Sequence, residues 1–495
     1  MQLSIKPGAG LLLKRVGNFL TGQGIKAYVV GGFVRDTLLS IDSADIDIAI
    51  ASNALEITPR IAQALGGKYV LLDKTNQVTR VVLVSKQAPA GSGQWHLDFS
   101  TLKGKVEQDL ARRDFTIDAM AVSLSELTSG SREVQLIDPF SGWEDLKQGQ
   151  IRATGETTFR EDAARLLRAV RLAAEFDFSI DQATETLIRR NCHLIASVAG
   201  ERVREELLRL LVSPEAGNFL SYLDELGLLT NIIPELAQSK GVEQPKEHFW
   251  DVFEHSLKTV IAASLLLREG AWEYDTGQIL SSVPWSERLV QHFDQEVSST
   301  SSRRSLLKLA ALLHDIAKPQ TKTIESGGRI RFLGHAKEGA EIAGGILERL
   351  RFSNKEIGLV KLIVQHHLRP GQLSQEGPPS PRAIYRYFRD SDDAGIETLY
   401  LSLADHLATR GPNLILAHWQ EHAQMVEYVL AQRFQREGVT SPPKLVSGDD
   451  LINIFGLSPG PRIGEILESV REALASGEIT TREEALSYIR DHLLS

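Results

Sequence analysis

The sequence predicts an N-terminal α/β domain followed by a chain that is almost entirely α-helical. Runs rich in β-branched and aromatic residues alternate with helical patterns up to about residue 150, and from about Thr157 apolar residues recur at helical spacing with few strand signals. The predicted strands are "KAYVVGG", "DIDIAI", "KYVLLD", "TRVVLVS", "WHLDFSTL" and "TIDAMAVSL".

Length and composition narrow the class of protein. The chain has 495 residues, enough for about three or four domains. Its net charge of −9 argues against a whole-surface polyanion binder, so a bound nucleic acid would need local basic patches and metal ions. Cys192 is the only cysteine, which excludes an intrachain disulfide and favours a cytoplasmic location. We expect no signal peptide and no membrane segment.

Helix breakers divide the helical part of the chain. "KGVEQPKEH" interrupts the helices near Gly241, and "REGVTSPPKLVSGDD" is typical of a Pro/Ser/Gly linker before a small helical tail. The predicted domains are therefore residues 1–150, 151–240, 241–436 and 445–495.

Two aspartates stand one residue apart in a predicted strand. Asp45 and Asp47 of "DIDIAI" would project from the same face, where their charges repel unless a cation neutralises them. Mg²⁺ prefers such oxygen ligands together with substrate phosphates. Asp98, in another apolar run, could supply a third carboxylate. The alternative is a solvated Asp-x-Asp at a strand end.

A glycine pair precedes these aspartates. Gly31 and Gly32 lie between a predicted strand and a helix, where backbone N–H groups can approach a phosphate. Arg35 follows in the first helical turn and can bind a triphosphate, although a local salt bridge with Asp36 is the alternative. Together these features fit metal-dependent nucleotidyl transfer.

"GGFVRDTLL…DIDIAI" resembles the signature of the class II tRNA nucleotidyltransferase and bacterial poly(A) polymerase family, within the polymerase-beta-like superfamily. Four further stretches resemble its later motifs in the family's order: "EQDLARRDFTIDAMA", "LIDPFSGWEDL", "REDAARLLRAVRLAAEF" and "ERVREELLRLL". The resemblance implies a nucleotidyltransferase head with a mixed sheet (residues 1–150), followed by an all-α neck and body (residues 151–240).

The resemblance also implies how the base is chosen. Asp162 and Arg165, three apart on one predicted helix, match the family's protein template, which reads the Watson–Crick edge of CTP and ATP. Arg168 and Arg171 continue the same face, and Arg113 matches a nucleotide-contacting arginine of the second motif. An intrahelical salt bridge with a solvated basic stripe is the alternative.

The chain departs from the family pattern twice. Asp118 stands where the family usually has Asn, a nearly isosteric change from which we expect a small effect. Only a short stretch separates Asp98 from "RRDFT", whereas CCA-adding members carry a flexible segment there. The short stretch resembles members that add only the two cytidines, with a separate enzyme adding the final A.

A second set of residues suggests another metal site. His255, the adjacent pair His314 and Asp315 in "LLHDIAKP", and Asp405 follow the order of the HD metal-dependent phosphohydrolase superfamily. His335, His366 and His367 lie where some members carry additional ligands. Imidazole and carboxylate ligands suit a divalent transition metal of unknown identity. Alternatives are a helix-surface His-Asp pair and a degenerate scaffold without metal.

The HD resemblance implies an α-helical domain over residues 241–436 that hydrolyses phosphate esters, with terminal 2′- or 2′,3′-cyclic phosphates of RNA as substrates by analogy. Residues 445–495 resemble the helical tail that holds the tRNA elbow, although a cap without RNA contact is the alternative.

The sequence therefore predicts a template-independent enzyme that adds CCA, or only CC, to tRNA 3′ ends from CTP and ATP, with Mg²⁺ at Asp45 and Asp47. One rival is a poly(A) polymerase. Another is an HD phosphohydrolase whose head only binds RNA, and a third is a non-catalytic RNA-binding protein.

Overall fold

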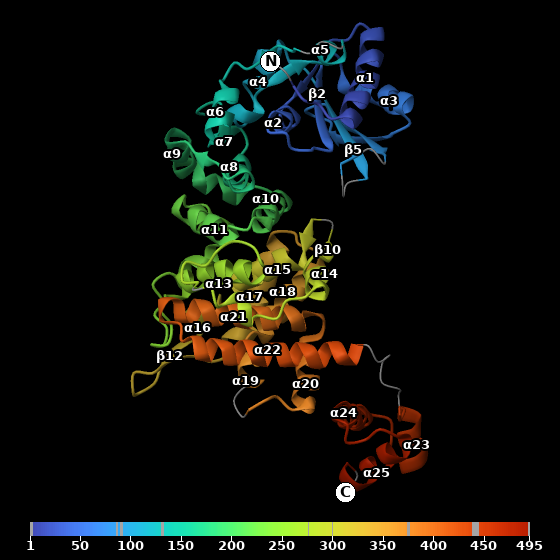
Figure 1. Cartoon of the computed structure of the whole chain (residues 1–495), viewed down its shortest axis with the longest axis vertical. Coiled ribbons are helices and arrows are strands. Elements are labelled where there is room, and N and C mark those ends of the chain that lie inside the picture. Colours follow the sequence, from blue (N-terminus) through green and yellow to red (C-terminus); the bar gives the residue numbers. More distant parts are fainter. Residues whose placement is uncertain are drawn as a thin grey trace. The chain divides into compact units, whose positions relative to one another are not determined.

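The computed structural model forms two compact units (Figure 1). One unit holds Met1–Val198 with Leu226–Leu228, and the other holds Ala199–Glu225 with Leu229–Ser495. The structure describes residues 3–85, 88–89, 93–129, 133–275, 277–298, 300–373, 377–437 and 445–493.

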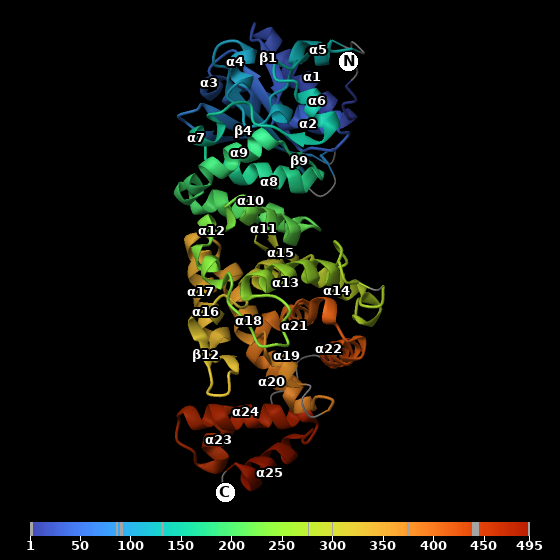
Figure 2. The same cartoon turned by 90° about the vertical axis from the view of Figure 1, so that its left-hand side faces the viewer.

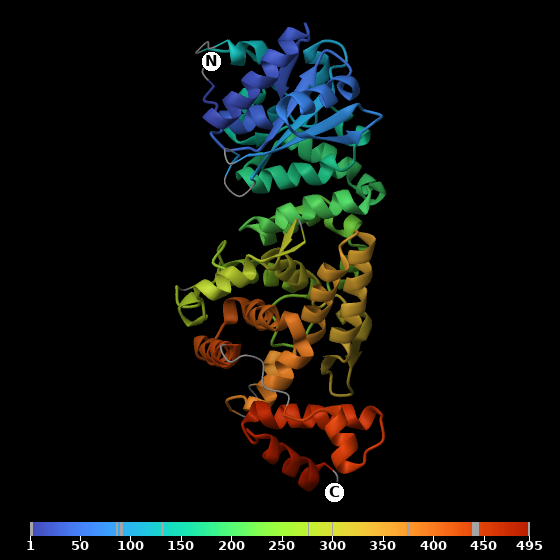
Figure 3. The ribbon, with the colours of Figure 1, turned by 90° about the vertical axis from the view of Figure 1, so that its right-hand side faces the viewer.

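A seven-stranded mixed sheet organises the N-terminal unit, in the order β3-β4-β5-β2-β1-β6-β7 (Figure 3). Only β2 and β5 pair in parallel, and every other neighbouring pair is antiparallel. The mixed sheet predicted for the head is confirmed. Its strands are β1 Ala27–Val30, β2 Asp45–Ile50, β3 Lys68–Asp73, β4 Val78–Val84, β5 Gln94–Thr101, β6 Ala121–Ser123 and β7 Leu136–Ile137.

Burial of the central strands explains why they form. Ile46, Ile48 and Ile50, which share one face of β2, are fully buried, as expected for a strand whose apolar face packs into the core. Short strands β8 Gln150–Ile151 and β9 Ser179–Ile180 pair separately. The helices of this unit are α1 Pro7–Gly22, α2 Gly32–Leu38, α3 Ala54–Leu65, α4 Val106–Leu110, η1 Thr116–Asp118, α5 Leu124–Thr128, α6 Gly142–Gln148, α7 Thr158–Glu161, α8 Arg165–Phe176, α9 Gln182–Asn191 and η2 Cys192–Ser197.

One predicted strand is mostly wrong. Of "TIDAMAVSL", only Ala121–Ser123 joins the sheet, because Thr116–Asp118 forms a 3₁₀ turn and a helix begins at Leu124. The turn is held by buried polar groups: the Thr116 hydroxyl donates to Asp145 Oδ2 at 2.7 Å, and the Asp118 carboxylate pairs with arginines described below. These long-range contacts override the local strand propensity.

The C-terminal unit is helical, as predicted, apart from two short hairpins. The hairpins are β10 Glu296–Ser298 with β11 Ser301–Ser302, and β12 Lys322–Ile324 with β13 Ile330–Phe332. Among the described residues, no helix combines the length and apolarity needed to cross a membrane. The helices before the tail are α10 Gly200–Val212, α11 Ala216–Glu225, α12 Leu229–Ile232, η3 Pro234–Ser239, α13 Val252–Leu266, η4 Leu280–Ser282, α14 Glu287–Phe293, α15 Arg303–Leu313, α16 Lys318–Thr321, α17 His335–Arg349, α18 Asn354–His366, α19 Arg369–Leu373, α20 Pro381–Ser391, η5 Asp392–Ala394, α21 Gly395–Arg410, η6 Gly411–Asn413 and α22 Leu416–Glu437.

Three helices form the tail: α23 Gly448–Phe455, α24 Pro461–Ser476 and α25 Arg482–His492 (Figure 2). They share a small apolar core that includes Leu451 and Ile489. Residues 438–444 of the predicted linker lie outside the described residues.

Candidate functional sites

The three predicted carboxylates meet at neighbouring positions of the sheet. Asp45 and Asp47 lie on β2, separated by the buried Ile46, so both project from the opposite face to that side chain. The parallel register places Asp47 beside Asp98 of β5. The strand alternation predicted the first pair, and the strand register adds the third carboxylate.

Two side chains that the sequence does not mark, His96 and Arg80, contact these acids. His96 Nδ1 lies 2.8 Å from Asp45 Oδ1, and Arg80 donates to both oxygens of Asp98 at 2.7 and 2.8 Å. Arg80 stands opposite Asp98 in the β4–β5 register. The only sequence signal for His96 is its place two residues before Asp98, on the same strand face.

The carboxylate of Asp47 has a perturbed pKa. Burial raises its pKa to about 6, Arg113 opposes that rise, and the like charge of Asp98 adds to it. An anion that is desolvated beside a second carboxylate is stabilised by a divalent cation. The donor set of Asp45, Asp47 and Asp98 therefore fits Mg²⁺.

The glycine pair connects β1 to α2 in the way that the sequence predicts. Gly31 has a φ of +71°, and its N–H donates to Met120 O. A Cβ at this position would lie 2.2 Å from Arg113 Nη1 and 3.2 Å from Asp47 Oδ2. Glycine is thus required where the chain, the Arg113 guanidinium and the Asp47 carboxylate converge. Gly32 begins α2.

Three of the predicted nucleotide-binding arginines converge on one buried residue, Asp118. Arg35 Nη1 donates to Asp118 Oδ1 at 2.6 Å, and Arg168 Nη2 donates to Asp118 Oδ2 at 3.3 Å. Arg113 Nη1 donates to the Asp118 carbonyl oxygen at 3.4 Å. The Arg35–Asp36 salt bridge weighed from the sequence also forms, at 2.7 Å. The sequence marked Asp118 only as a departure and missed this role.

The prediction that Asp162 and Arg165 share one helix is wrong. Asp162 has an extended backbone (φ −151°, ψ 106°) between α7 and α8, and its Oδ1 accepts from Ala164 N–H at 3.1 Å. The Asp side chain competes with helical hydrogen bonds and terminates α7. Arg165 begins α8 and donates to the carbonyl oxygens of Arg112 and Thr158.

The remaining α8 arginines differ from each other. Arg168 is partly exposed and pairs with Asp114 at 2.7 Å as well as with Asp118. Arg171 is only 4% exposed and pairs with Glu175 one turn later. Arg168 is thus accessible to a ligand, whereas the buried Arg171 stabilises helix α8 through its pair with Glu175.

The stretch between the third carboxylate and Arg113 is short and described throughout. β5 ends at Thr101, and the five-residue helix Val106–Leu110 follows. Lys105, Glu107 and Asp109 make this segment polar, and its start is fixed to the sheet by the hydrogen bond that Leu102 N–H donates to Ile50 O.

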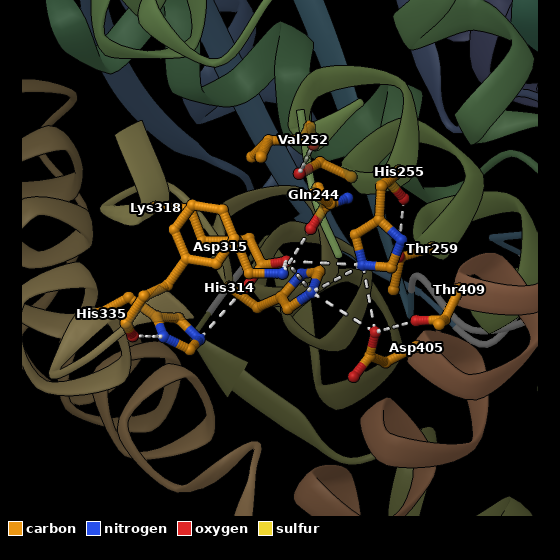
Figure 4. Close-up of polar contacts among 12 residues, drawn as sticks. Gln244, Val252, His255, Thr259, His314, Asp315, Lys318, His335, Asp405 and Thr409 are labelled. Carbon is orange, nitrogen blue, oxygen red and sulfur yellow. Dashed lines mark hydrogen bonds and ion pairs between the residues drawn. The ribbon is translucent and has the colours of Figure 1, made fainter. Parts of the chain in front are cut away.

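The C-terminal unit brings the predicted HD residues together (Figure 4). His255 from α13 places Nε2 3.0 Å from Asp405 Oδ1 of α21, 3.3 Å from His314 Nε2 and 3.5 Å from Asp315 Oδ2. His314 and Asp315 follow the last residue of α15 rather than lying within it. All but the partly exposed Asp405 are buried. Together the four residues can surround one cation.

A second group lies on the other side of Asp315. His335 Nε2 is 3.4 Å and His367 Nε2 is 3.8 Å from Asp315 Oδ1, and the two imidazole nitrogens are 3.3 Å apart. The Asp315 carboxylate therefore faces one histidine pair with each oxygen, an arrangement suited to bridging two metal ions. His366, the alternative to His367, ends α18 and is absent from both described groups.

Backbone carbonyls orient these imidazoles. The Nδ1–H groups of His314, His335 and His367 point at the carbonyl oxygens of Ala311, Phe332 and Val364, at 2.8, 2.6 and 2.7 Å. A neutral ring oriented in this way presents Nε2 as a lone-pair acceptor, and a cation bound between two such atoms 3.3 Å apart would satisfy both. Burial lowers the pKa of His367 to about 3, and nearby His314 contributes, which keeps that ring neutral for metal binding. The residues fit a divalent transition metal.

Lys318 lies beside Asp315, although it was not among the residues expected from the sequence. Its Nζ lies 2.6 Å from Asp315 Oδ2 and donates to Gln244 Oε1 at 2.6 Å (Figure 4). Its position three residues after Asp315, in "HDIAK", was the available signal. A cation here can contact a phosphate that approaches the metals.

A cavity of about 820 Å³ opens beside this cluster. Asp405 and His367 reach it from the metal side. Its other lining side chains include basic, apolar, polar and acidic groups, among them His406, Arg410, His418, His422, Leu368, Met425, Tyr428, Gln424 and Glu421. The cavity is large enough for a small phosphate ester.

Comparisons with known families match both parts of the chain. The Poly A polymerase head domain matches residues 27–152, and the HD domain matches residues 252–410. A model for an RNA-binding site of polymerase A matches residues 177–240, and one for tRNA nucleotidyltransferase domain 2 matches residues 392–489.

Curated relatives match almost the whole chain. The A-adding tRNA nucleotidyltransferase of Deinococcus radiodurans is 33% identical over 94% of this chain and 95% of its own length. The CC-adding tRNA nucleotidyltransferase of Thermus thermophilus is 32% identical over 94% and 93%. The solved structure of the Thermotoga maritima CCA-adding enzyme with tRNA has a TM-score of 0.61 at 22% identity, and covers 98% of this chain and 96% of its own. That likeness shows a shared fold.

Proposed function

This chain belongs to the tRNA nucleotidyltransferase family, and we propose that it adds the two cytidines of the CCA end to tRNA. Full-length relatives include both CC-adding and A-adding enzymes, so membership alone leaves the product open. The observation that carries the choice is the short connection from Thr101 to Arg113. It leaves no room for the flexible segment associated with the switch from C to A.

The N-terminal unit supports nucleotidyl transfer. The 3′-hydroxyl of the terminal tRNA ribose attacks the α-phosphate of CTP, and pyrophosphate leaves. Mg²⁺ bound by Asp45 and Asp47, with Asp98 beside them, would stabilise the charge that develops on the phosphate oxygens. Arg35, Arg113 and Arg168 would hold the triphosphate and base, while Gly31 and Gly32 let the backbone approach.

The test uses three tRNA substrates that end before CCA, after the first C, and after both cytidines. Each is incubated with Mg²⁺ and CTP, ATP or both, and products are sized at single-nucleotide resolution. Arrest after two cytidines supports the proposal and implies a separate A-adding enzyme. Addition of A to the third substrate contradicts it, and shows an A-adding or complete CCA-adding enzyme. Extension of unstructured RNA with ATP alone would instead indicate a poly(A) polymerase.

We infer a second activity, hydrolysis of phosphate esters, in the C-terminal unit. The observation favouring it is the two histidine pairs that face the oxygens of Asp315, beside a cavity that Asp405 and Arg410 line. Lys318 would contact the substrate phosphate. RNA ends that carry a 2′-phosphate or a 2′,3′-cyclic phosphate are the proposed substrates.

Metal reconstitution tests this activity. The chelated protein is incubated with Mn²⁺, Ni²⁺, Co²⁺ or Zn²⁺ and with oligonucleotides bearing each terminal phosphate. Release of phosphate, or opening of the cyclic ester, supports the proposal when Asp315→Asn removes it. Activity that Asp315→Asn leaves unchanged would place the chemistry elsewhere, and no turnover with any of these metals would indicate a degenerate scaffold.

A further inference from the structure

Asp118 is a buried carboxylate between two cations of the nucleotide site. It is 2% exposed and ends the 3₁₀ turn Thr116–Asp118. One oxygen accepts from Arg35 of α2, and the other accepts from Arg168 of α8. A single side chain thus connects two helices that each present an arginine.

Each arginine also contacts a second acidic residue of its own, and Asp118 contacts both arginines. Arg35 also donates Nε and Nη2 to Asp36 Oδ1, and its guanidinium lies 4.5 Å from the Phe176 ring centroid. Arg168 also places Nε 2.7 Å from Asp114 Oδ2. Asp36 and Asp114 each hold one arginine, whereas Asp118 sets the two relative to each other.

The two arginines stabilise the ionised Asp118 carboxylate although it is buried. Burial alone would raise the pKa of Asp118, but Arg35 and Arg168 outweigh burial and hold the pKa below its ordinary value. The carboxylate is therefore ionised at neutral pH. Charge-assisted hydrogen bonds of this kind are stronger than neutral ones and fix geometry more tightly.

We propose that Asp118 is a positioning residue that holds Arg35 and Arg168 in the orientation that binds the incoming nucleotide. This inference rests on the proposed nucleotidyl transfer and goes beyond it, because the earlier expectation was that this departure from the family pattern has little effect. Asn at this position keeps one acceptor oxygen, enough for Arg35, but turns an NH₂ group toward Arg168, which has no acceptor.

The experiment measures CTP binding by titration calorimetry, together with KM and kcat for cytidine addition, in the full chain. We expect Asp118→Ala to weaken CTP binding about tenfold or more and Asp118→Asn about threefold, with KM changing more than kcat. Asp109→Ala is the matched control, since it removes an Asp–Arg pair of 2.6 Å with Arg112 and should leave CTP binding within about twofold.

A double-mutant cycle separates positioning from general stability. If Asp118 acts through Arg168, Asp118→Asn should add nothing in an Arg168→Gln background. If Asp118→Ala does not fold, Asp118→Asn at an unchanged melting temperature decides alone. Unchanged CTP affinity and KM in Asp118→Asn, or fully additive losses in the cycle, overturn the inference. A wild-type protein that neither binds CTP nor adds cytidine would instead overturn the proposed function itself.

Discussion

At the residue scale, Asp47 shows how a carboxylate placed to bind a metal ion can oppose stability. The side chain is desolvated and lies beside Asp98, and its pKa is raised to about 6. At neutral pH the desolvated anion is less stable in the folded protein than an ordinary aspartate is in the unfolded chain. This difference lowers the free energy of unfolding. A bound cation reverses that cost.

The first prediction separates these effects with an isosteric change. Asp47→Asn should slow cytidine addition at least about 100-fold, because the amide is a poor metal ligand. The same variant should melt at an equal or higher temperature than the wild type in a chelator, because the unfavourable charge is gone. Single-turnover incorporation and thermal melting provide both readouts.

Asp73→Asn is the control for this prediction. Asp73 ends β3 and accepts hydrogen bonds from Asn76, away from the other acids, so its replacement should leave incorporation unchanged. A clear drop in the melting temperature of Asp47→Asn, without loss of activity, would mean that Asp47 is structural.

The second prediction concerns the shared carboxylate Asp315. Its two oxygens face different histidine pairs, so His335→Ala should lower the bound metal from two ions to one, whereas Asp315→Asn should disturb both. Metal content after dialysis, measured by atomic emission, tests this. Equal stoichiometry in His335→Ala and the wild type would show that a single ion is held by His255, His314 and Asp405.

At the element scale, the sequence predicts what depends on local periodicity and misses what depends on register. The sequence places Asp45 and Asp47 correctly because strand alternation is a local pattern. It also places the glycine turn before α2 correctly, because that turn is a local feature too. His96 and Arg80 join the site only through pairing of β2, β4 and β5, which no local pattern contains. Asp162 was misplaced because its side chain ends α7 instead of continuing the helix.

Ion pairs connect helix α20 to helix α24. Arg386 donates to both oxygens of Glu472, at 2.8 Å and 2.5 Å, and Arg389 donates to the same carboxylate at 2.9 Å. Hydrogen bonds from Arg386 lower the pKa of Glu472. A lowered carboxylate pKa means that the stabilisation is complete above the ordinary value and is lost as pH falls through the lowered one.

The third prediction follows from this sign. Glu472→Gln should raise amide hydrogen exchange in α20 and α24, and high salt should do the same in the wild type, because screening weakens exposed ion pairs. As the pH falls through the lowered pKa of Glu472, the wild type should come to exchange like the variant once intrinsic rates are corrected. Glu465→Gln on α24 is the control, an exposed position. Salt-independent exchange would show that apolar packing holds the tail.

At the scale of the whole molecule, the two proposed chemistries belong to separate compact units. The carboxylates of β2 and β5 lie in the unit that contains Met1–Val198, and the HD residues lie in the other. That division falls inside the neck predicted at residues 151–240, so the four predicted boundaries stay predictions. The two sites also use different ligands, oxygen atoms alone in one and imidazole with carboxylate in the other.

The last prediction is that the two activities can be removed independently. Asp45→Ala should abolish cytidine addition with Mg²⁺ and leave metal-dependent phosphate release intact, because no HD ligand changes. Asp315→Asn should do the reverse. Both reactions are measured on the same protein preparations, with Mg²⁺ for addition and Mn²⁺ or Ni²⁺ for hydrolysis. If Asp45→Ala still adds cytidine, the head is not the catalytic unit that its geometry suggests. If it loses both activities while its melting temperature is unchanged, the two sites are energetically coupled, and the C-terminal unit acts on tRNA only in concert with the head.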